Sequence, residues 1–341
     1  MSWATRNDKR HERWKKLTTG TTAKQTRYRF GLIPMPATCL HPQPPYNFHL
    51  SAMIFSGGDL QIRTYENGIF RQVLDIEGTA VLAEVFSRGS TDAPELCITI
   101  NPDNTLSGTG RNKASNLISS MFNINEDLSP FYQAMEKDRI MATLISRLRG
   151  VKSPTTPTVF EALVDSVIEQ QISLKAARTI ENRLIRAFGT RLILKDQVYY
   201  GYPTPHTLAE TTDPGFRSCG LTRRKGEYIR GISQQIAGAS LDLENFSTYP
   251  DTEMIIRELT KIRGIGQWTA ELTVLRGLHR TDAFPADDIG VRRFIAQFYM
   301  NDTDISPAQA RSFAERWGPW KGYAAYYLEI ADLLGISPSG P

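Results

Sequence analysis

Two adjacent carboxylates, Asp287 and Asp288, stand directly before a run of helical periodicity from Ile289 to Met300. The start of a helix offers free backbone amides and the positive end of the helix dipole, and both favour an ionised carboxylate. A single aspartate at such a place is most simply an N-cap. Two adjacent aspartates allow one to cap the helix while the other does chemistry, such as stabilising a developing positive charge.

A second chemical feature precedes this loop. In the segment "RGIGQ", Gly264 and Gly266 flank Ile265 and join two runs of helical period. Glycines tolerate a positive φ and let another backbone approach closely. Exposed amides at the start of the following helix, from Gln267 onward, are suited to a phosphate oxygen. By itself the pattern fits a structural helix–turn–helix equally well.

The rest of the chain has to position these residues. It has 341 residues, of which 40% are hydrophobic and 22% charged, which suits two or three globular domains. Short apolar runs separated by Gly, Asn, Asp and Ser turns predict strands of an antiparallel sheet. Those runs are 48–55, 68–76, 79–87 and 95–100, and a helix is expected at 110–122.

Helical periodicity dominates from residue 125 onward. One helix is expected to begin at Thr158, with Glu161 completing a T-x-x-E capping box. The predicted fold is α+β: a small antiparallel sheet domain followed by an all-helical domain. The predicted ranges are a basic, disordered tail at 1–29, a β-rich domain at 30–124 and a helical domain at 125–341, with the hairpin at 252–279.

Composition narrows the class of protein. The formal net charge of +4 and the pI of about 8.9 are compatible with nucleic acid binding. Cys39, Cys97 and Cys219 are widely spaced, so a disulfide framework, a zinc site and an iron–sulfur cluster are not expected. Neither a membrane-spanning run nor a secretory signal is expected. The predicted location is intracellular: cytoplasmic and nucleoid-associated, or nuclear.

The combination of hairpin and acidic loop carries a family resemblance. The segments "IRGIGQWTA" and "PADD-x-x-V-x-R" resemble the helix–hairpin–helix (HhH-GPD) DNA glycosylases of base-excision repair, and most closely the 3-methyladenine DNA glycosylase II (AlkA-like) subfamily. Further similar segments follow in the expected order: 157–173, 202–210, 220–229 and 314–328. The resemblance covers roughly 125–335 and implies that the N-terminal sheet is a TBP-like domain.

The resemblance assigns roles to the residues described above. It implies that Asp288 is the catalytic carboxylate and that Asp287 caps the helix. Bifunctional members carry a Schiff-base lysine where this chain has Trp268, so the chain is expected to be monofunctional. Trp268 is then either a wall of the base pocket or a core residue.

The resemblance also implies where DNA and a cation bind. Backbone carbonyls of Thr260, Ile262 and Ile265 are expected to hold a structural Na⁺ or K⁺, and no other cofactor is required. Gln170 and Gln171 are either the wedge that fills the vacated base stack or caps of a helix junction. The expected DNA contacts are Gly264, Ile265, Gly266, Gln267, Arg223, Arg224, Lys225 and Arg293.

The base pocket departs from the family pattern. Two positions that are aromatic in the best-known bacterial representative are Leu272 and Glu329 here. Glu329 either accepts a hydrogen bond from a base or lies in solvent. The remaining pocket candidates are Trp268, Trp320, Tyr323 and Tyr327, with helix packing as the alternative for the tyrosines and Trp320.

The implied function is release of alkylated purines, such as 3-methyladenine and 7-methylguanine, from double-stranded DNA by a monomeric enzyme. Three alternatives stay open. The substrate is instead a deaminated or oxidised base (hypoxanthine, uracil or 8-oxoguanine), with or without lyase activity; the chain binds DNA without catalysis; or it is a structural bundle.

Overall fold

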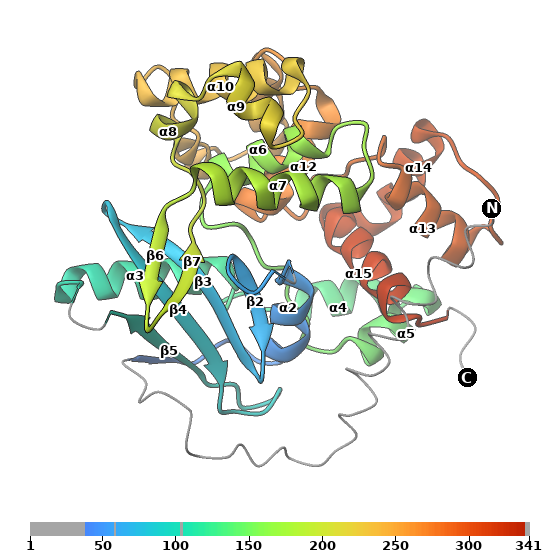
Figure 1. The fold of residues 1–341 in the computed structure, drawn as a ribbon. Helices are drawn as coiled ribbons and strands as arrows, with labels where there is room; N and C mark the ends of the chain where they lie inside the picture. The colour runs from blue at the N-terminus through green and yellow to red at the C-terminus, as the bar shows by residue number, and fades with distance from the viewer. Residues whose placement is uncertain (1–37, 58, 103–104, 338–341) are drawn as a thin grey trace.

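The computed structural model describes residues 38–57, 59–102 and 105–337. The predicted basic tail at 1–29 lies outside these residues. In Figure 1 a twisted sheet forms one part of the molecule, and helices form the rest above and beside it. The predicted boundary at 124/125 falls between the last helix against the sheet and the first helix of the remainder.

The sheet has five antiparallel strands in the order β1-β5-β4-β3-β2. Alternate residues point to one face, as the period of a strand requires. Phe70, Val85 and Ile98 on that face are buried against a flanking helix. The elements are β1 (Thr38–Leu40), α2 (Phe48–Phe55), β2 (Arg63–Glu66), β3 (Ile69–Ile76), β4 (Thr79–Ser87), β5 (Leu96–Asn101) and α3 (Gly108–Met121).

The strand predicted at 48–55 is wrong, because this segment is helix α2. Asn47 caps it by accepting a hydrogen bond from the amide of Leu50 at 3.1 Å. Phe48, Ala52 and Met53 are buried, which is the spacing of one helix face. In so short a segment the pattern of apolar and polar residues fits both the period of a strand and the period of a helix. The packing of its apolar face against the rest of the protein decides for the helix.

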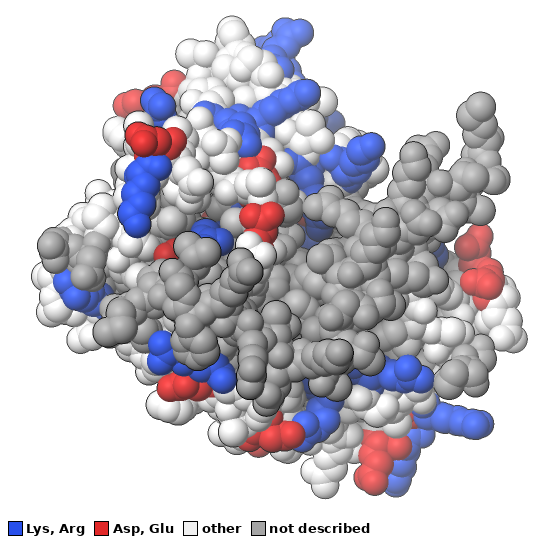
Figure 2. All heavy atoms as spheres, turned by 60° about the horizontal axis from the view of Figure 1, so that its bottom comes forward, with Lys and Arg blue, Asp and Glu red and all other residues white. Residues whose placement is uncertain are grey.

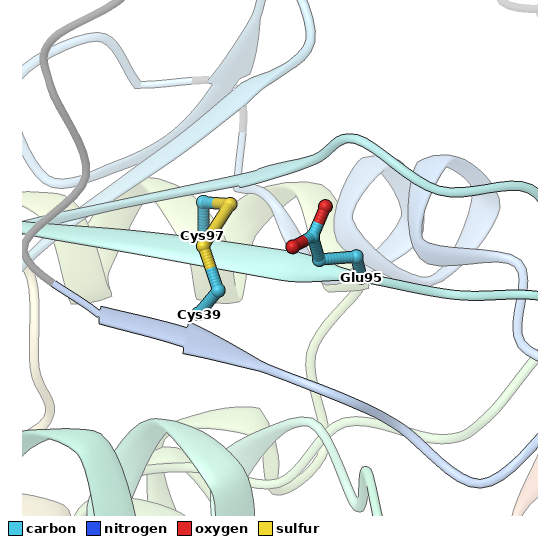
Figure 3. Close-up of side chains that lie close together, drawn as sticks. All are labelled: Cys39, Glu95 and Cys97. Carbon is cyan, nitrogen blue, oxygen red and sulfur yellow. A yellow bond between two sulfur atoms is a disulfide. The ribbon is translucent and has the colours of Figure 1, made fainter.

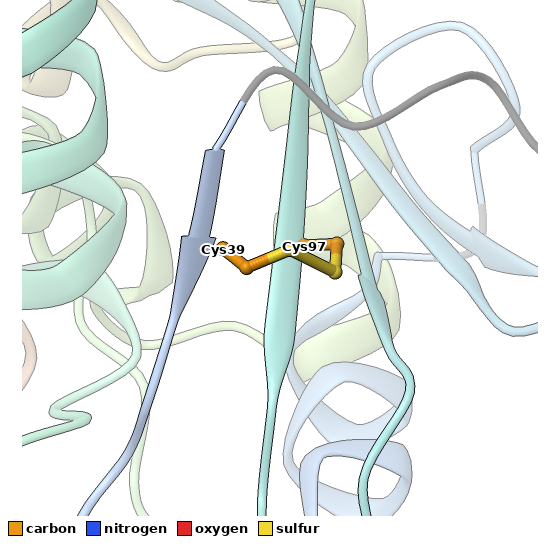
Figure 4. Close-up of a disulfide and its surroundings, with 2 residues drawn as sticks. All are labelled: Cys39 and Cys97. Atoms are coloured by element: carbon orange, nitrogen blue, oxygen red, sulfur yellow. A yellow bond between two sulfur atoms is a disulfide. The ribbon is translucent and has the colours of Figure 1, made fainter.

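A disulfide framework was not expected from the sequence, and the structure contains one disulfide that the cysteine spacing did not indicate. Cys39 on β1 and Cys97 on β5 are direct cross-strand partners, with Cα atoms 4.2 Å apart, and they form a disulfide (Figure 4). Glu95 lies near both sulfurs (Figure 3). The two cysteines are 58 residues apart in the chain, so their pairing depends on strand order, which the sequence did not reveal. Because the sulfurs bond to each other, they are not available as metal ligands in this state.

The helices pack around two separate hydrophobic cores. The first core is built by α6 (Val159–Glu169), α7 (Leu174–Phe188), α8 (Pro205–Glu210), α9 (Asp213–Ser218), α10 (Arg223–Ala237), η1 (Glu244–Thr248), α11 (Thr252–Thr260) and α12 (Gln267–Leu278). The second is built by α4 (Ser129–Met135), α5 (Arg139–Arg147), α13 (Ile289–Tyr299), α14 (Pro307–Ala314), η2 (Glu315–Trp320) and α15 (Lys321–Leu334).

One hairpin interrupts the region that was expected to be all-helical. Strands β6 (Arg191–Leu194) and β7 (Gln197–Tyr200) pair with each other and pack against the five-stranded sheet. The amide of Tyr200 donates to the carbonyl of Gln61 at 2.8 Å, and Gly201 lies so close to Val73 that a Cβ there would be 2.9 Å from its side chain. The hairpin therefore fastens the helices to the sheet.

A buried ionic cluster makes a second link between sheet and helices. Arg63 of β2 lies 3.5 Å from Glu161 on α6 and 3.4 Å from Glu181 on α7. Thr158 does cap α6, accepting from the amide of Glu161 at 3.1 Å. The Glu161 side chain, however, faces Arg63, so the predicted capping box is only half formed.

The surface charge is mixed. Figure 2 shows one face on which Lys and Arg side chains lie among Asp and Glu side chains. Ion pairs between exposed side chains, such as Arg149 with Asp92 at 2.6 Å and Lys113 with Glu77, contribute to the mixed surface charge of the described residues. Among the described residues, no helix combines the length and apolar character needed to cross a membrane.

Candidate active site

The acidic loop passes from one helical core to the other. Ala283 belongs to the first core, whereas Phe284 and Ala286 are buried in the second. Two backbone hydrogen bonds tighten the loop, from Ala286 to the carbonyl of Phe284 and from Asp288 to the carbonyl of Pro285, both at 2.9 Å. The loop therefore holds Asp288 at the seam between the cores, where α13 begins.

Both carboxylate oxygens of Asp288 accept hydrogen bonds. Oδ1 accepts from the amide of Val291 at 3.0 Å, which makes Asp288 the N-cap of α13. Oδ2 accepts from the indole Nε1 of Trp268 at 3.0 Å. The side chain is half-buried, so it is held rigidly and still reaches the surface. These features suit a carboxylate that must face a reacting centre.

The predicted division of labour between the two aspartates is wrong in one respect. Asp287 is exposed, and the cap of α13 is Asp288 itself. The following arginines have other partners: Arg292 donates to the carbonyl of Ile305 at 3.2 Å, and Arg293 donates to Asp332 at 3.0 Å. Arg293 is therefore tied to α15, which weakens the prediction that it contacts DNA.

The G-I-G turn joins α11 to α12 as predicted. Gly264 has φ +93°, and a Cβ there would lie 2.4 Å from the ring of Tyr228. The side chain of Ile265 is buried in the first core, so only its backbone can meet a ligand. Gly266 is exposed, and a Cβ on it would meet no atom within 4 Å. The turn thus presents open backbone at Gly266 and Gln267, as a phosphate site requires.

The two wedge candidates have separate roles. Gln170 donates from Nε2 to the carbonyl of Gly264 and to the hydroxyl of Thr269, both at 3.0 Å, so it ties α6 to the hairpin and does not project. Gln171 is exposed and has φ +57°, a conformation that residues other than glycine rarely adopt. Ile172 and Leu174 beside it are also exposed. This tip keeps Gln171 as the wedge candidate and adds apolar neighbours.

Helix α12 turns one stripe toward the acidic loop. Trp268, Leu272 and Arg276 follow at intervals of four residues, and Arg276 pairs with Glu169 of α6 at 2.8 Å. Trp268 is half-buried and bonded to Asp288, so it belongs to the site and not only to a core. Leu272 is buried beneath it.

Glu329 on α15 is electrostatically coupled to this group. Its side chain is open to solvent, yet the protein around the carboxyl desolvates it and raises its pKa above the ordinary value. Arg276 lowers that pKa in part, whereas Asp288 raises it further. The electrostatic influence of Asp288 on this pKa places Glu329 in the neighbourhood of the acidic loop.

The other aromatic candidates do not form a base pocket. Tyr323 and Tyr327 are almost fully buried; Tyr323 donates to Glu126 at 3.0 Å and Tyr327 to the carbonyl of Val151 at 2.9 Å. Trp320 is half-buried and packs on Phe131, with ring centroids 5.8 Å apart. These aromatic residues pack in the second core, which is the helix packing that the sequence left open as the alternative.

The three basic residues at the start of α10 also differ from one another. Arg223 and Arg224 are exposed, and Arg223 pairs with Glu227 at 3.0 Å. Lys225 is buried, and its Nζ donates to the carbonyls of Ile168 at 2.7 Å and Gln170 at 2.6 Å. The prediction that Lys225 contacts phosphate is therefore wrong; this lysine closes the C-terminal end of α6.

Sequence reasoning missed two residues behind the loop, Glu271 and Arg311. The Arg311 guanidinium donates to Glu271 at 3.0 Å and to the carbonyl of Phe284 at 3.3 Å. Glu271 is buried on α12, and a charge on an otherwise core-facing position was the signal available in the sequence.

Comparisons with known proteins agree with this geometry. Residues 164–319 match the model of the HhH-GPD superfamily base excision DNA repair proteins. The DNA-3-methyladenine glycosylase of Bacillus subtilis is 30% identical over 213 residues, which is 62% of this chain and 69% of that protein. The solved structure of a 3-methyladenine DNA-glycosylase from Archaeoglobus fulgidus superposes with a TM-score of 0.77 at 26% identity, covering 86% of this chain and 98% of the other.

A more distant structure shares the fold alone. The Clostridium acetobutylicum 8-oxoguanine glycosylase/lyase bound to double-stranded DNA gives a TM-score of 0.68 at 20% identity, covering 88% of this chain and 99% of the other. Sheet, hairpin and acidic loop together define a helix–hairpin–helix protein of the DNA-repair class. The chain belongs to the HhH-GPD superfamily of base excision DNA repair proteins, in its AlkA-like subfamily.

Proposed function

We propose that this chain is a monofunctional DNA glycosylase that hydrolyses the N-glycosidic bond of alkylated purines and leaves an abasic site. The observation that carries the proposal is the double hydrogen bonding of Asp288, to Val291 and Trp268, at the seam beside the G-I-G hairpin. A carboxylate fixed in this way can face the C1′ atom of a nucleotide that is turned out of the duplex.

The chemistry follows from the charge of the substrate. As the bond between C1′ and the base nitrogen breaks, its electron pair leaves with the base and positive charge builds on the sugar. The Asp288 carboxylate stabilises that charge and orients a water, whose oxygen bonds to C1′ while its proton passes to the carboxylate or to solvent.

Alkylated purines suit this site because they need no acid. A purine alkylated at N3 or N7 already carries a positive charge and departs as a neutral base. The hydrogen-bond partners of Asp288 are an indole and a backbone amide, and neither is a proton donor of useful acidity. Trp268 also occupies the place of a Schiff-base lysine, which supports hydrolysis without strand cleavage.

Glu329 is proposed to favour cationic bases. An ionised Glu329 would attract a positively charged purine near Asp288, whereas a neutral base gains nothing from that charge. We expect Glu329→Gln to reduce release of 7-methylguanine more than release of neutral hypoxanthine, measured as the ratio of single-turnover rates. An unchanged ratio would contradict this role.

The deciding experiment measures the bases released from methylated duplex DNA by mass spectrometry. Release of 3-methyladenine or 7-methylguanine by the wild type, lost in Asp288→Asn, is the expected result. If the enzyme released bases only from DNA that contains hypoxanthine or 8-oxoguanine, the substrate class would be deaminated or oxidised bases and not alkylated purines. If borohydride trapped a covalent adduct, the mechanism would be bifunctional and not monofunctional. If the wild type and Asp288→Asn released the same amount of base, Asp288 would not be the catalytic carboxylate.

Three further features belong to the proposal. The partner is double-stranded DNA, which the hairpin and the wedge tip would bind, and the enzyme acts as a monomer. A monovalent cation at the carbonyls of Thr260, Ile262 and Ile265 would bridge the hairpin to a DNA phosphate. The buried side chains of Ile262 and Ile265 and the open backbone at Gly266 support this placement.

A further inference from the structure

Arg311 of α14 stands where the hairpin helix and the acidic loop meet. One guanidinium nitrogen donates to Glu271 Oε1 on α12 at 3.0 Å, and the other donates to the carbonyl of Phe284 in the loop at 3.3 Å. Gln267, the first residue of α12, donates from Nε2 to the same Glu271 oxygen at 2.9 Å. A continuous set of hydrogen bonds thus runs from the hairpin to the loop.

The two charged members of this network differ in burial: the Glu271 carboxylate is buried, whereas Arg311, which supplies its counter-charge, is partly exposed. The Glu271 side chain is 1% exposed, and its Oε2 atom is buried with no hydrogen-bond partner among the described residues. Arg311 is 41% exposed. Burying a carboxylate is unfavourable unless a counter-charge compensates it, and Arg311 is the cation that pairs with it. Burial raises the pKa of Glu271, and the bonds from Gln267 and Arg311 lower it again.

The network lies on both sides of the Trp268–Asp288 contact. Trp268 sits on α12 between Gln267 and Glu271, and Asp288 follows Phe284 in the loop. The bond between Trp268 and Asp288 keeps its length only if the first turn of α12 and the loop stay in register. Arg311 donates to the Glu271 side chain of α12 and to a backbone carbonyl of the loop, so it links these two segments.

We propose that Arg311, through Glu271, is a positioning residue that holds the catalytic aspartate in register with the DNA-binding hairpin. Arg311 itself touches neither the base nor the sugar. The proposal rests on the function proposed above, since it assigns Asp288 the chemistry and the hairpin the DNA backbone.

The test compares Arg311→Met, Arg311→Lys and Glu271→Gln with the wild type. For Arg311→Met we expect the single-turnover rate of 7-methylguanine release to fall about 10- to 100-fold, as a misplaced reacting group does. The affinity of Arg311→Met for DNA that carries an abasic analogue should change less than about twofold. The slope of this affinity against salt concentration should also change less than about twofold. Arg311→Lys should recover part of the rate, because an ammonium keeps the pair with Glu271. Arg316→Met, which removes an arginine stacked on Phe313, is the matched control and should keep the wild-type rate.

Two outcomes would overturn the proposal. If Arg311 contacted a DNA phosphate, Arg311→Met would weaken DNA binding and reduce the slope of its salt dependence by about one, while the rate on saturating DNA would stay unchanged. If the role of Arg311 were purely structural, Arg311→Met would lower the unfolding temperature without lowering the rate of the folded enzyme. If the wild type releases no base, the proposed function fails separately, and hydrogen exchange at residues 284–288 still tests whether Arg311→Met loosens the loop.

Discussion

At the scale of single residues, the contact between Trp268 and Asp288 is the central feature of the site. The indole donates to Asp288 Oδ2 at 3.0 Å, while the other oxygen is occupied by the amide of Val291. The indole therefore selects one orientation of the carboxylate. The ring also fills space beside Leu272, and replacement by phenylalanine would remove the hydrogen bond while keeping an aromatic ring.

We expect Trp268→Phe to lower the single-turnover rate of base release about 10- to 100-fold. A hydrogen bond to a charged group contributes about 1.5–3 kcal/mol, and each 1.4 kcal/mol corresponds to a factor of ten in rate. Quenched-flow measurement with saturating enzyme isolates this step, and affinity for abasic DNA should stay within about twofold. A rate equal to that of the wild type would show that the bond does not orient the carboxylate.

Residue chemistry predicted only part of this site. The place of an acidic group before α13 followed from the sequence, because helix starts favour carboxylates. The sequence did not reveal that Asp288 itself caps α13, since capping was assigned to Asp287. Nor did residue type distinguish Lys225, which is buried on carbonyls, from its exposed neighbours Arg223 and Arg224. These differences depend on which face of a helix meets another element.

At the scale of elements, the hairpin between α11 and α12 combines two glycines with different tasks. Gly264 has φ +93° and lies against the ring of Tyr228, so its lack of a side chain serves the fold. Gly266 has φ −95°, and a Cβ there would meet nothing within 4 Å. Its lack of a side chain serves no contact within the described protein, and it leaves open space in front of the backbone.

Alanine substitutions should separate these tasks. Gly264→Ala is expected to lower the free energy of unfolding by roughly 1–3 kcal/mol, because of the positive φ and the clash with Tyr228. Gly266→Ala should leave stability nearly unchanged but weaken binding to duplex DNA, since its methyl group stands where the DNA backbone approaches. Urea unfolding and fluorescence anisotropy measure the two quantities. Equal effects of both substitutions on stability would remove the distinction.

Elements were predictable where their period was long and less so where it was short. The helices α6 and α12 begin within one residue of where they were expected, and the strands β3, β4 and β5 match their predicted ranges to within one residue, because several turns or alternations repeat the signal. The eight residues of α2 did not repeat it often enough, and the β6–β7 hairpin lay inside a region read as helical. In both places contact with the sheet decides the structure.

At the scale of the whole molecule, the sheet and the helices meet through charge that is buried. Arg63 comes from β2, while its acidic partners Glu161 and Glu181 come from α6 and α7. Asp165, also on α6, accepts a hydrogen bond from Tyr202 at 2.7 Å. Nothing in the sequence indicated this cluster, since its members are separated along the chain and meet only after the two parts pack.

The cluster holds more acid than base, and this should make stability depend on pH. Burial, with a contribution from Glu181, raises the pKa of Glu161 to about 7 although Arg63 opposes the rise. The folded chain therefore binds more protons than the unfolded chain between the ordinary pKa of a glutamate and about 7. In that window the contribution of Glu161 to the free energy of unfolding falls as pH rises, because the folded state has to release a proton that it holds tightly.

Glu161→Gln should therefore flatten the pH dependence of stability. Glutamine cannot ionise, so the variant avoids the unfavourable buried charge above about pH 7, while Glu181 still pairs with Arg63. We expect the fall in unfolding temperature between about pH 5 and about pH 8 to be smaller than in the wild type. Glu258→Gln, an exposed glutamate paired with Lys261, is the control and should follow the wild-type curve. Parallel curves for Glu161→Gln and the wild type would mean that Arg63 keeps Glu161 ionised throughout, and the junction of sheet and helices would then be a fixed ion pair and not a site of proton uptake.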